Sequence, residues 1–179
     1  MRIIRSGGTN ASLTTNDPDY EVYGFGKYFM LQLKPQLDEI IGSGGKVAVC
    51  VAAKPNKDRY NEPLKAIGYD LDELIILGRE DSANWEEYEA VTLLGGETQQ
   101  LHNWLSRTGF SIDALKNCMI LGGDSAGAYV LAAKTIVTYE PDGSSFEIID
   151  GFMPDSNLLV AAHVNNPYYH LPALSEELK

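Results

Sequence analysis

The sequence predicts an α/β fold, a three-layer sandwich in which helices cover both faces of a mostly parallel sheet. Short apolar runs alternate with longer amphipathic segments over the 179 residues. The apolar runs are continuous rather than alternating, which is typical of strands that are buried on both faces of a parallel sheet. Most of these runs are followed by helical spacing, which favours repeated strand–helix units.

The first half of the chain contains three predicted strands and two predicted helices. Residues 25–41 have apolar side chains at helical spacing and end at Gly42, while Pro35 predicts a kink or a late start. Residues 61–67 form a weaker helical segment. Residues 9–23 are polar and tyrosine-rich, and they form either a surface loop or a lid near the strand ends. The predicted strands are residues 3–5, 46–51 and 74–77.

The second half of the chain places a pair of glycines after each of two predicted strands. These strands are residues 90–94 and 118–121, and helices are predicted at 98–106 and 126–133. Further short elements complete this half: one or two helical turns within 82–89, strand-like segments at 135–139, 146–149 and 158–162, and a turn at 141–143.

Composition excludes several classes of function. A net charge of −11 repels phosphate backbones, so nucleic acids and anionic membranes are not expected as partners. The sequence shows no signal peptide, and its apolar runs are much shorter than the about 18 residues that a membrane-spanning helix needs. These two observations predict a cytoplasmic protein. Cys50 and Cys118 lie in apolar runs and suit reduced core thiols. The three histidines lack metal-ligand spacing, so we expect neither a metal nor a cofactor.

The sharpest motif is Gly-x-Ser-x-Gly at residues 123–127, where a buried strand turns directly into a helix. This is the context of a nucleophile elbow, in which small neighbours allow a strained turn to expose Ser125. N–H groups at the start of the following helix, that of Ala126 first, would stabilise an oxyanion. A Gly/Ser/Ala turn selected for tight packing alone remains the alternative reading of the motif.

A second glycine turn, residues 93–98, ends the preceding strand and opens the next helix. The carboxyl ends of neighbouring parallel strands meet at one edge of a sheet, so the backbone at Gly96 is a candidate for the other half of an oxyanion hole. Glu97, Thr98 and Asp124 flank the two glycine turns and are candidate substrate-binding residues. Thr98 equally suits a cap of the following helix.

A serine nucleophile needs a base and a group that orients the base. His163 follows an apolar run and is the candidate base, with His170 as the substitute. His102 lies inside a predicted helix and is expected to be a surface residue. Glu140 and Asp142 lie between serine and histidine in sequence, and either could orient the imidazole.

These segments together resemble the peptidase E (aspartyl dipeptidase) family, which also contains cyanophycinase. The resemblance rests on the Gly-Gly-x-Thr-x-x-Leu turn at residues 95–101, the Gly-x-Ser-Ala-Gly-Ala elbow at 123–128, and Asp-Gly-Phe at 150–152, which leads to His163. It implies a class I glutamine amidotransferase-like, flavodoxin-like sandwich. It also implies a serine peptidase with Ser125 as nucleophile, His163 as base and Glu140 as acid, and an oxyanion hole at Gly96 and Ala126.

Departures from the family affect the expected substrate. Only 16 residues follow His163, and none of them is arginine. We therefore expect a single α/β hydrolytic domain over residues 1–179 without the family's C-terminal strands. Its substrates would be short peptides, with a poor match to Asp-X dipeptides. The remaining candidate cation for an acidic group is a lysine or arginine from elsewhere in the chain, such as Arg5 at the end of the first strand.

Other classes fit the sequence less well. An α/β-hydrolase esterase needs more strands and helices than the 38 residues from Ser125 to His163 provide, and a glutaminase needs cysteine at the elbow. A non-catalytic binding or regulatory domain on the same scaffold remains the alternative function. The sequence leaves open whether the chain forms a homo-oligomer.

Overall fold

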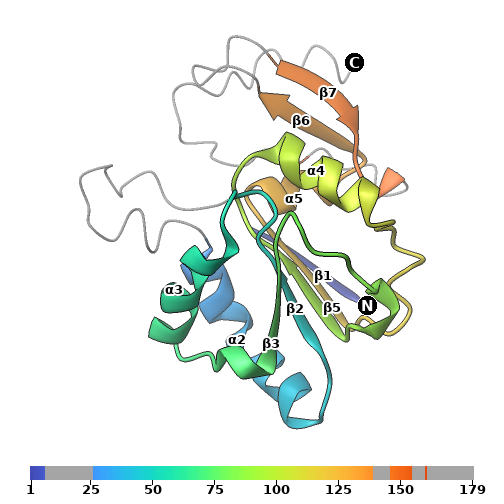
Figure 1. Ribbon diagram of the computed structural model, residues 1–179. Coiled ribbons are helices and arrows are strands. Elements are labelled where there is room, and N and C mark those ends of the chain that lie inside the picture. The colour runs from blue at the N-terminus through green and yellow to red at the C-terminus, as the bar shows by residue number, and fades with distance from the viewer. Residues whose placement is uncertain (7–25, 139–145, 155–159, 161–179) are drawn as a thin grey trace.

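The sheet is the centre of the molecule. The computed structural model describes residues 1–6, 26–138, 146–154 and 160. Within these ranges, five strands form one parallel sheet in the order β1-β5-β4-β2-β3 (Figure 1), which confirms the predicted architecture. The strands are β1 (Arg2–Ser6), β2 (Val47–Cys50), β3 (Leu74–Leu77), β4 (Ala90–Leu93) and β5 (Ile120–Asp124).

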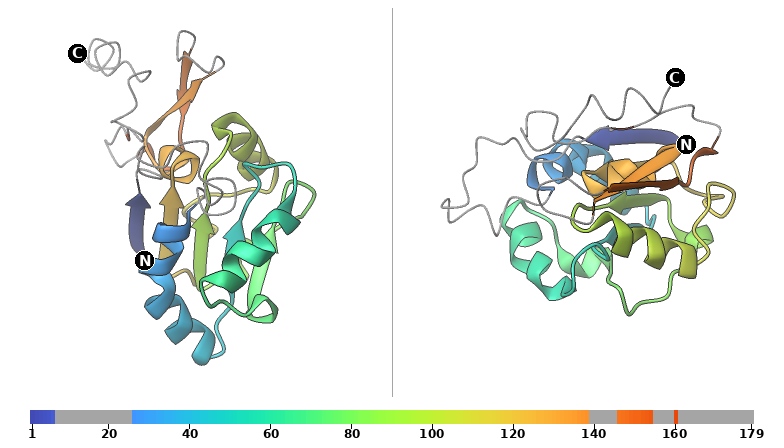
Figure 2. Two further views of the ribbon diagram at one scale, coloured as in Figure 1. Left: turned by 90° about the vertical axis from the view of Figure 1, so that its left-hand side faces the viewer. Right: turned by 90° about the horizontal axis from the view of Figure 1, so that it is seen from above.

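Helices pack on both faces of this sheet (Figure 2). The chain runs outward from β1 to β2 and β3 and then returns through β4 to β5. Because strand–helix–strand crossovers are right-handed, this reversal puts α2 and α3 on one face and α4 on the other. The helices are α2 (Lys27–Gly42), α3 (Asn61–Ala66), α4 (Thr98–Arg107) and α5 (Ala126–Val130), with short 3-10 turns η1 (Lys57–Tyr60), η2 (Leu71–Glu73) and η3 (Trp85–Glu87).

The interior strands are buried along their whole length because both of their faces contact a core. In β2, Val47 and Val49 belong to the core beneath α2 and α3, whereas Ala48 and Cys50 belong to the core beneath α4 and α5. The strand period of two is therefore hidden in the sequence, since both faces are apolar. Burying the side chain of one such valine stabilises the folded state by about 1.5–3 kcal/mol relative to leaving it exposed.

Helix α2 runs through Pro35 without interruption, so the predicted late start is wrong. The N–H group that Pro35 lacks would have met the carbonyl of Leu31, and both residues are exposed, which allows water to bind that carbonyl instead. On the opposite side of the helix, Leu33 and Leu37 are buried against the sheet. Packing of this apolar face outweighs the local cost of the proline.

The elements after the elbow differ from the prediction. Strand β5 begins at Ile120 rather than at 118 and includes the two glycines, and α5 ends at Val130 rather than at 133. The carbonyls of Val130 and Ala132 accept hydrogen bonds from the segment at 151–153, which competes with a further helical turn. Strands β6 (Lys134–Thr138) and β7 (Phe146–Asp150) form a separate antiparallel pair outside the parallel sheet.

Both cysteines are buried free thiols, as the sequence predicts. Burial raises the pKa of Cys118 to about 11 and that of Cys50 still further, so both remain protonated at neutral pH. In the described part of the chain, helices are too short or too polar to cross a bilayer. The segments predicted at 9–23 and 141–143, and that at 158–162 except for Val160, lie outside the described residues.

Candidate active site

Ser125 sits where β5 turns directly into α5. Its backbone angles are φ 51° and ψ −112°, and among the described residues it is the one non-glycine residue with a positive φ. A conformation of this kind costs about 1–3 kcal/mol and persists only where the surrounding structure imposes it. The structure thus places the predicted nucleophile in a strained strand-to-helix turn, the backbone geometry of a nucleophile elbow.

Two glycines impose this geometry by allowing close approach. A Cβ atom on Gly123 would overlap with the carbonyl of Gly127, and a Cβ atom on Gly127 would overlap with the carbonyl of Leu93 in β4. The helix therefore begins directly against the strands. The backbone of Ser125 connects α5 to β1: its N–H donates to the carbonyl of Ser6 in β1 at 3.0 Å, and its carbonyl accepts from Tyr129 N in α5 at 3.0 Å.

The second glycine turn passes directly beside Ser125. A Cβ atom built on Gly95 would lie 3.0 Å from Ser125 Cβ and 3.5 Å from Ser125 Oγ. Gly96 has a φ of 146°, and a Cβ atom on it would lie 2.6 Å from the carbonyl oxygen of Ala53. Only glycine can adopt this positive φ and also leave room for the Ala53 carbonyl. The predicted proximity of the two turns at the carboxyl edge is therefore present in the structure.

Backbone N–H groups at these turns are the candidate oxyanion donors. Within the described residues, no acceptor pairs with the N–H groups of Gly95 and Gly96, whereas that of Glu97 donates to the carbonyl of Ala53 at 3.0 Å. The N–H of Ala126 lies in the first turn of α5, where the helix offers no carbonyl partner. Since α5 has five residues, individual N–H groups rather than a helix dipole would stabilise an oxyanion here.

The three candidate substrate-binding residues lie in different environments. Glu97 is the N-terminal flanking residue of α4, so Thr98 begins the helix and is not its cap. Asp124 is 3% exposed, and a Cβ atom on Gly26, just before α2, would lie 3.7 Å from its Oδ2. Strand alternation therefore turns the Asp124 carboxylate toward the α2 side of the sheet, away from Glu97 and Thr98, which belong to the α4 side.

The candidate base and acid lie outside the described residues: His163, its substitute His170, Glu140 and Asp142. His102 is described, and it is half-buried rather than a surface residue. Its Nε2 lies 2.9 Å from the carbonyl oxygen of Asp150, and its ring centroid lies 4.9 Å from that of Phe152. This imidazole links α4 to the end of β7.

The Arg5 side chain makes two contacts within the fold, both with segments that follow the elbow. Its Nε donates to the carbonyl of Leu131 at 2.6 Å, and its Nη2 lies 3.1 Å from the sulfur of Met153. Burial lowers the pKa of the guanidinium from its ordinary value. Arg5 therefore links the end of β1 to the residue that follows α5 and to the segment that follows β7.

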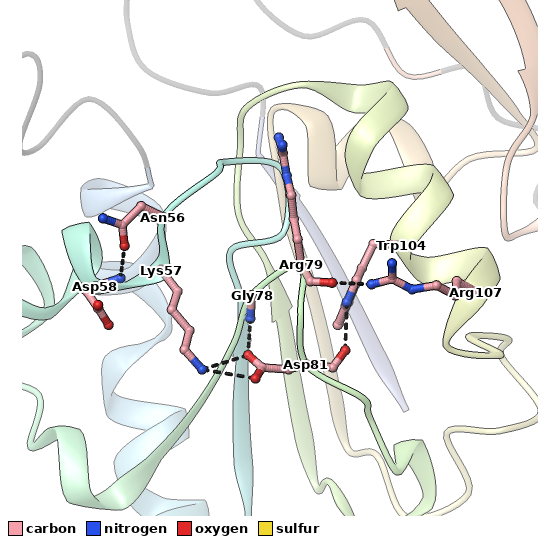
Figure 3. A network of polar contacts seen from close by, with 8 residues as sticks. All are labelled: Asn56, Lys57, Asp58, Gly78, Arg79, Asp81, Trp104 and Arg107. Atoms are coloured by element: carbon pink, nitrogen blue, oxygen red, sulfur yellow. Dashed lines mark hydrogen bonds and ion pairs between the residues drawn. The ribbon is translucent and has the colours of Figure 1, made fainter.

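Asp81 lies in the loop after β3 and forms hydrogen bonds with two other parts of the fold, a feature that the sequence did not reveal. Its carboxylate accepts hydrogen bonds from Lys57 Nζ at 2.8 and 3.1 Å and from Gly78 N at 2.7 Å (Figure 3). Its main-chain carbonyl accepts from Trp104 Nε1 at 3.1 Å. The loop is thereby joined both to η1 and to α4, and this fixes the residues that precede Asp81 at the carboxyl edge of the sheet.

Replacing Asp81 with asparagine should lower the free energy of unfolding at pH 7 by about 1 kcal/mol, since this ion pair is partly exposed. Burial raises the pKa of Asp81, but the hydrogen bonds from Lys57 and Gly78 and the charge of Lys57 outweigh it and lower the pKa overall. The ionised Asp81 carboxylate therefore contributes its full stabilisation of the folded state above the unfolded-state pKa of about 3.9. This stabilisation is lost as pH falls through the lower folded-state pKa.

Urea unfolding of both proteins from neutral pH to about pH 2.5 measures this effect. The two stabilities should converge at the acid end of the range. Asp113→Asn is the matched control, because Asp113 is exposed and no cation pairs with it in the described part of the chain. A constant difference between parent and Asp81→Asn at all pH values would contradict the assigned role of the carboxylate.

Comparisons with known proteins support the fold. No protein-family model and no curated protein matches the chain. Among solved structures, a peptidase from an acI-B1 Actinobacterium is similar over 99% of this chain and 75% of its own, with 18% identity and a TM-score of 0.57. The chain thus has the three-layer α/β architecture of this structure, consistent with a flavodoxin-like fold. In the described ranges, no group of three or more His, Cys, Asp or Glu side chains could hold a metal ion.

Proposed function

We propose that the protein is a serine peptidase that hydrolyses short peptides, in the manner of a dipeptidase, by acyl transfer through Ser125. The strained backbone of Ser125 between β5 and α5 carries this proposal. The adjacent glycine turn at Gly95 supports it, because an oxyanion hole needs donors beside the nucleophile. The likeness to a solved peptidase structure is consistent with it.

The reaction would follow the logic of a catalytic triad. Ser125 Oγ would attack the carbonyl carbon of the scissile bond while His163 takes the hydroxyl proton, and Glu140 would orient the imidazole. The negative charge on the carbonyl oxygen would be bound by the N–H groups of Gly96 and Ala126. Breakage of the C–N bond would release the amine with the proton from His163. Water would then hydrolyse the acyl-enzyme and restore Ser125.

Covalent labelling tests this proposal directly. A small fluorophosphonate should add one adduct to the intact protein, located by peptide mass spectrometry at Ser125, because only an activated serine reacts at a useful rate. The Ser125→Ala protein should remain unlabelled. If the parent protein is neither labelled nor able to hydrolyse a panel of dipeptides, the non-catalytic binding or regulatory domain becomes the better assignment.

A further inference from the structure

The carboxylate of Asp124 lies on the α2 side of the elbow. Asp124 is the last residue of β5 and directly precedes Ser125. In the sheet it is paired with Ser6 of β1, and the carbonyl of Ser6 accepts the Ser125 N–H at 3.0 Å. Asp124 is 3% exposed, so its carboxylate is enclosed by the fold. The peptide bond between the two residues therefore connects a buried carboxylate to the strained residue of the elbow.

This carboxylate lies at the N-terminal end of α2. A Cβ atom on Gly26, the N-cap residue of the helix, would lie 3.7 Å from Asp124 Oδ2. Gly26 has no side chain that could cap the helix, and the first turn of α2 contains no acidic residue. A larger residue would not fit at position 26, because φ is 84° and a Cβ atom would lie 3.1 Å from Leu94 Cδ2. Asp124 thus supplies from β5 the negative charge that a helix N-terminus favours.

The surroundings of Asp124 strengthen the effect of its charge. The core beneath α2 and α3 includes Leu94 and Tyr60. Burial raises the pKa of the Tyr60 hydroxyl; the charge of Arg59 opposes this shift, and the charge of Asp124 adds to it. The charge of Asp124 therefore acts on a second buried group, as expected where little water screens it. Its removal should have a larger effect here than the removal of a surface charge.

The strained turn needs support on both sides of Ser125. The φ of 51° persists only where the surrounding structure imposes it. After Ser125, the close approach of Gly127 to β4 holds α5 in place. Before Ser125, relaxation of the turn would rotate the Asp124–Ser125 peptide, and a backbone change at Asp124 would carry its carboxylate away from α2. The attraction between the carboxylate and the helix N-terminus therefore opposes relaxation of the elbow.

We propose that Asp124 is a positioning residue of the candidate active site: its buried carboxylate, at the N-terminus of α2, fixes the strained backbone that presents Ser125. This inference rests on the proposed peptidase function, and it replaces the substrate-binding role that the sequence predicted for Asp124. Asp124 acts through Ser125 and touches neither the peptide nor the reacting atoms. The role needs the charge as well as the shape of the side chain, because a helix N-terminus attracts a carboxylate more strongly than a neutral amide.

Hydrogen exchange of backbone amides, followed by NMR on the full chain, tests this role without turnover. The N–H groups of Ser125 and Tyr129 report on the elbow, because they donate to Ser6 and to Ser125. The Val49 N–H in the interior strand β2 reports on the whole fold. Asp124→Asn keeps the shape of the side chain and removes its charge. It should speed exchange at Ser125 and Tyr129 by about tenfold and leave Val49 unchanged.

Asp70→Asn is the matched control. The exposed Asp70 carboxylate accepts a hydrogen bond from Asp72 N at the start of η2, which precedes β3. This variant removes the same charge from a capping carboxylate at the amino edge of the sheet, so exchange at Ser125 should not change. If Asp124→Asn instead speeds exchange equally at Ser125, Tyr129 and Val49, its effect is a general loss of stability, and the positioning role is overturned.

Kinetics separate positioning from substrate binding. In an active protein, Asp124→Asn should lower kcat by about tenfold and keep KM within about twofold, because the peptide still binds while Ser125 is misplaced. Labelling of Ser125 by the fluorophosphonate should slow to the same extent. A raised KM with an unchanged kcat would support the substrate-binding role instead and overturn the proposal.

The outcomes distinguish this inference from the proposed function. Faster exchange confined to the elbow of Asp124→Asn, where the parent neither reacts with the fluorophosphonate nor hydrolyses peptides, supports Asp124 as the support of the turn and contradicts the peptidase. An active peptidase in which Asp124→Asn exchanges and reacts like Asp70→Asn overturns the positioning role and leaves the function standing. An inactive parent whose elbow exchange does not respond to Asp124→Asn overturns both.

Discussion

Replacement of Ser125 by alanine is expected to lower kcat for a cleaved dipeptide by about 10⁵-fold or more. The covalent route disappears with the nucleophile, and the oxyanion donors alone retain only a small part of the acceleration. Binding of the peptide should change little, because the hydroxyl is one small group within the site. Steady-state kinetics on protein free of host peptidases measures the loss, and circular dichroism checks the fold.

Two further variants make this result specific. Ser106→Ala removes a hydroxyl that donates to the carbonyl of His102 on α4, and it should keep kcat within about twofold. Ser125→Gly should be as inactive as Ser125→Ala but more stable than the parent by about 1 kcal/mol, because glycine adopts φ 51° without strain. Hydrolysis retained by Ser125→Ala would refute the assignment of the nucleophile.

Replacement of Gly127 by alanine is expected to lower the free energy of unfolding by about 3 kcal/mol or more. The added methyl group would overlap with the carbonyl of Leu93, which is backbone of the central strand β4 and cannot rotate away. Helix α5 would have to move away from the sheet. This movement would shift Ser125 relative to Gly95, so activity should fall as well. Urea unfolding measures the first effect and dipeptide kinetics the second.

Gly42→Ala is the control for this substitution. No atom lies within 4 Å of a Cβ at Gly42, which is the last residue of α2 and has an ordinary negative φ. Alanine there should be neutral or slightly stabilising, by about 0.5 kcal/mol, because it restricts the unfolded chain. A Gly127→Ala protein as stable as the parent would show that the elbow tolerates a wider gap between helix and strand than its geometry indicates.

Local patterns predicted most of the helices and strands. The apolar runs of β2, β3 and β4 lie within one residue of their predicted bounds, because burial on both faces leaves an uninterrupted signal. The start of β5 was predicted two residues early, since Cys118 is apolar and buried without belonging to the strand. The antiparallel pair β6–β7 was predicted as two strand segments but not as a separate sheet, because pairing partners do not appear in local periodicity.

The sequence by itself determined the elbow. Glycines two residues before and after Ser125, between a buried strand and a helix, leave few backbone geometries, and the structure has the expected one. The tertiary structure alone decided which cations reach the edge of the sheet. The strand order β1-β5-β4-β2-β3 lets Arg5 donate to the carbonyl of Leu131 just after α5, and it brings Arg79 to the carbonyl of Ala53, which lies against Gly96. Such contacts join segments far apart in the chain, so they depend on strand order and side-chain packing, which local spacing does not encode.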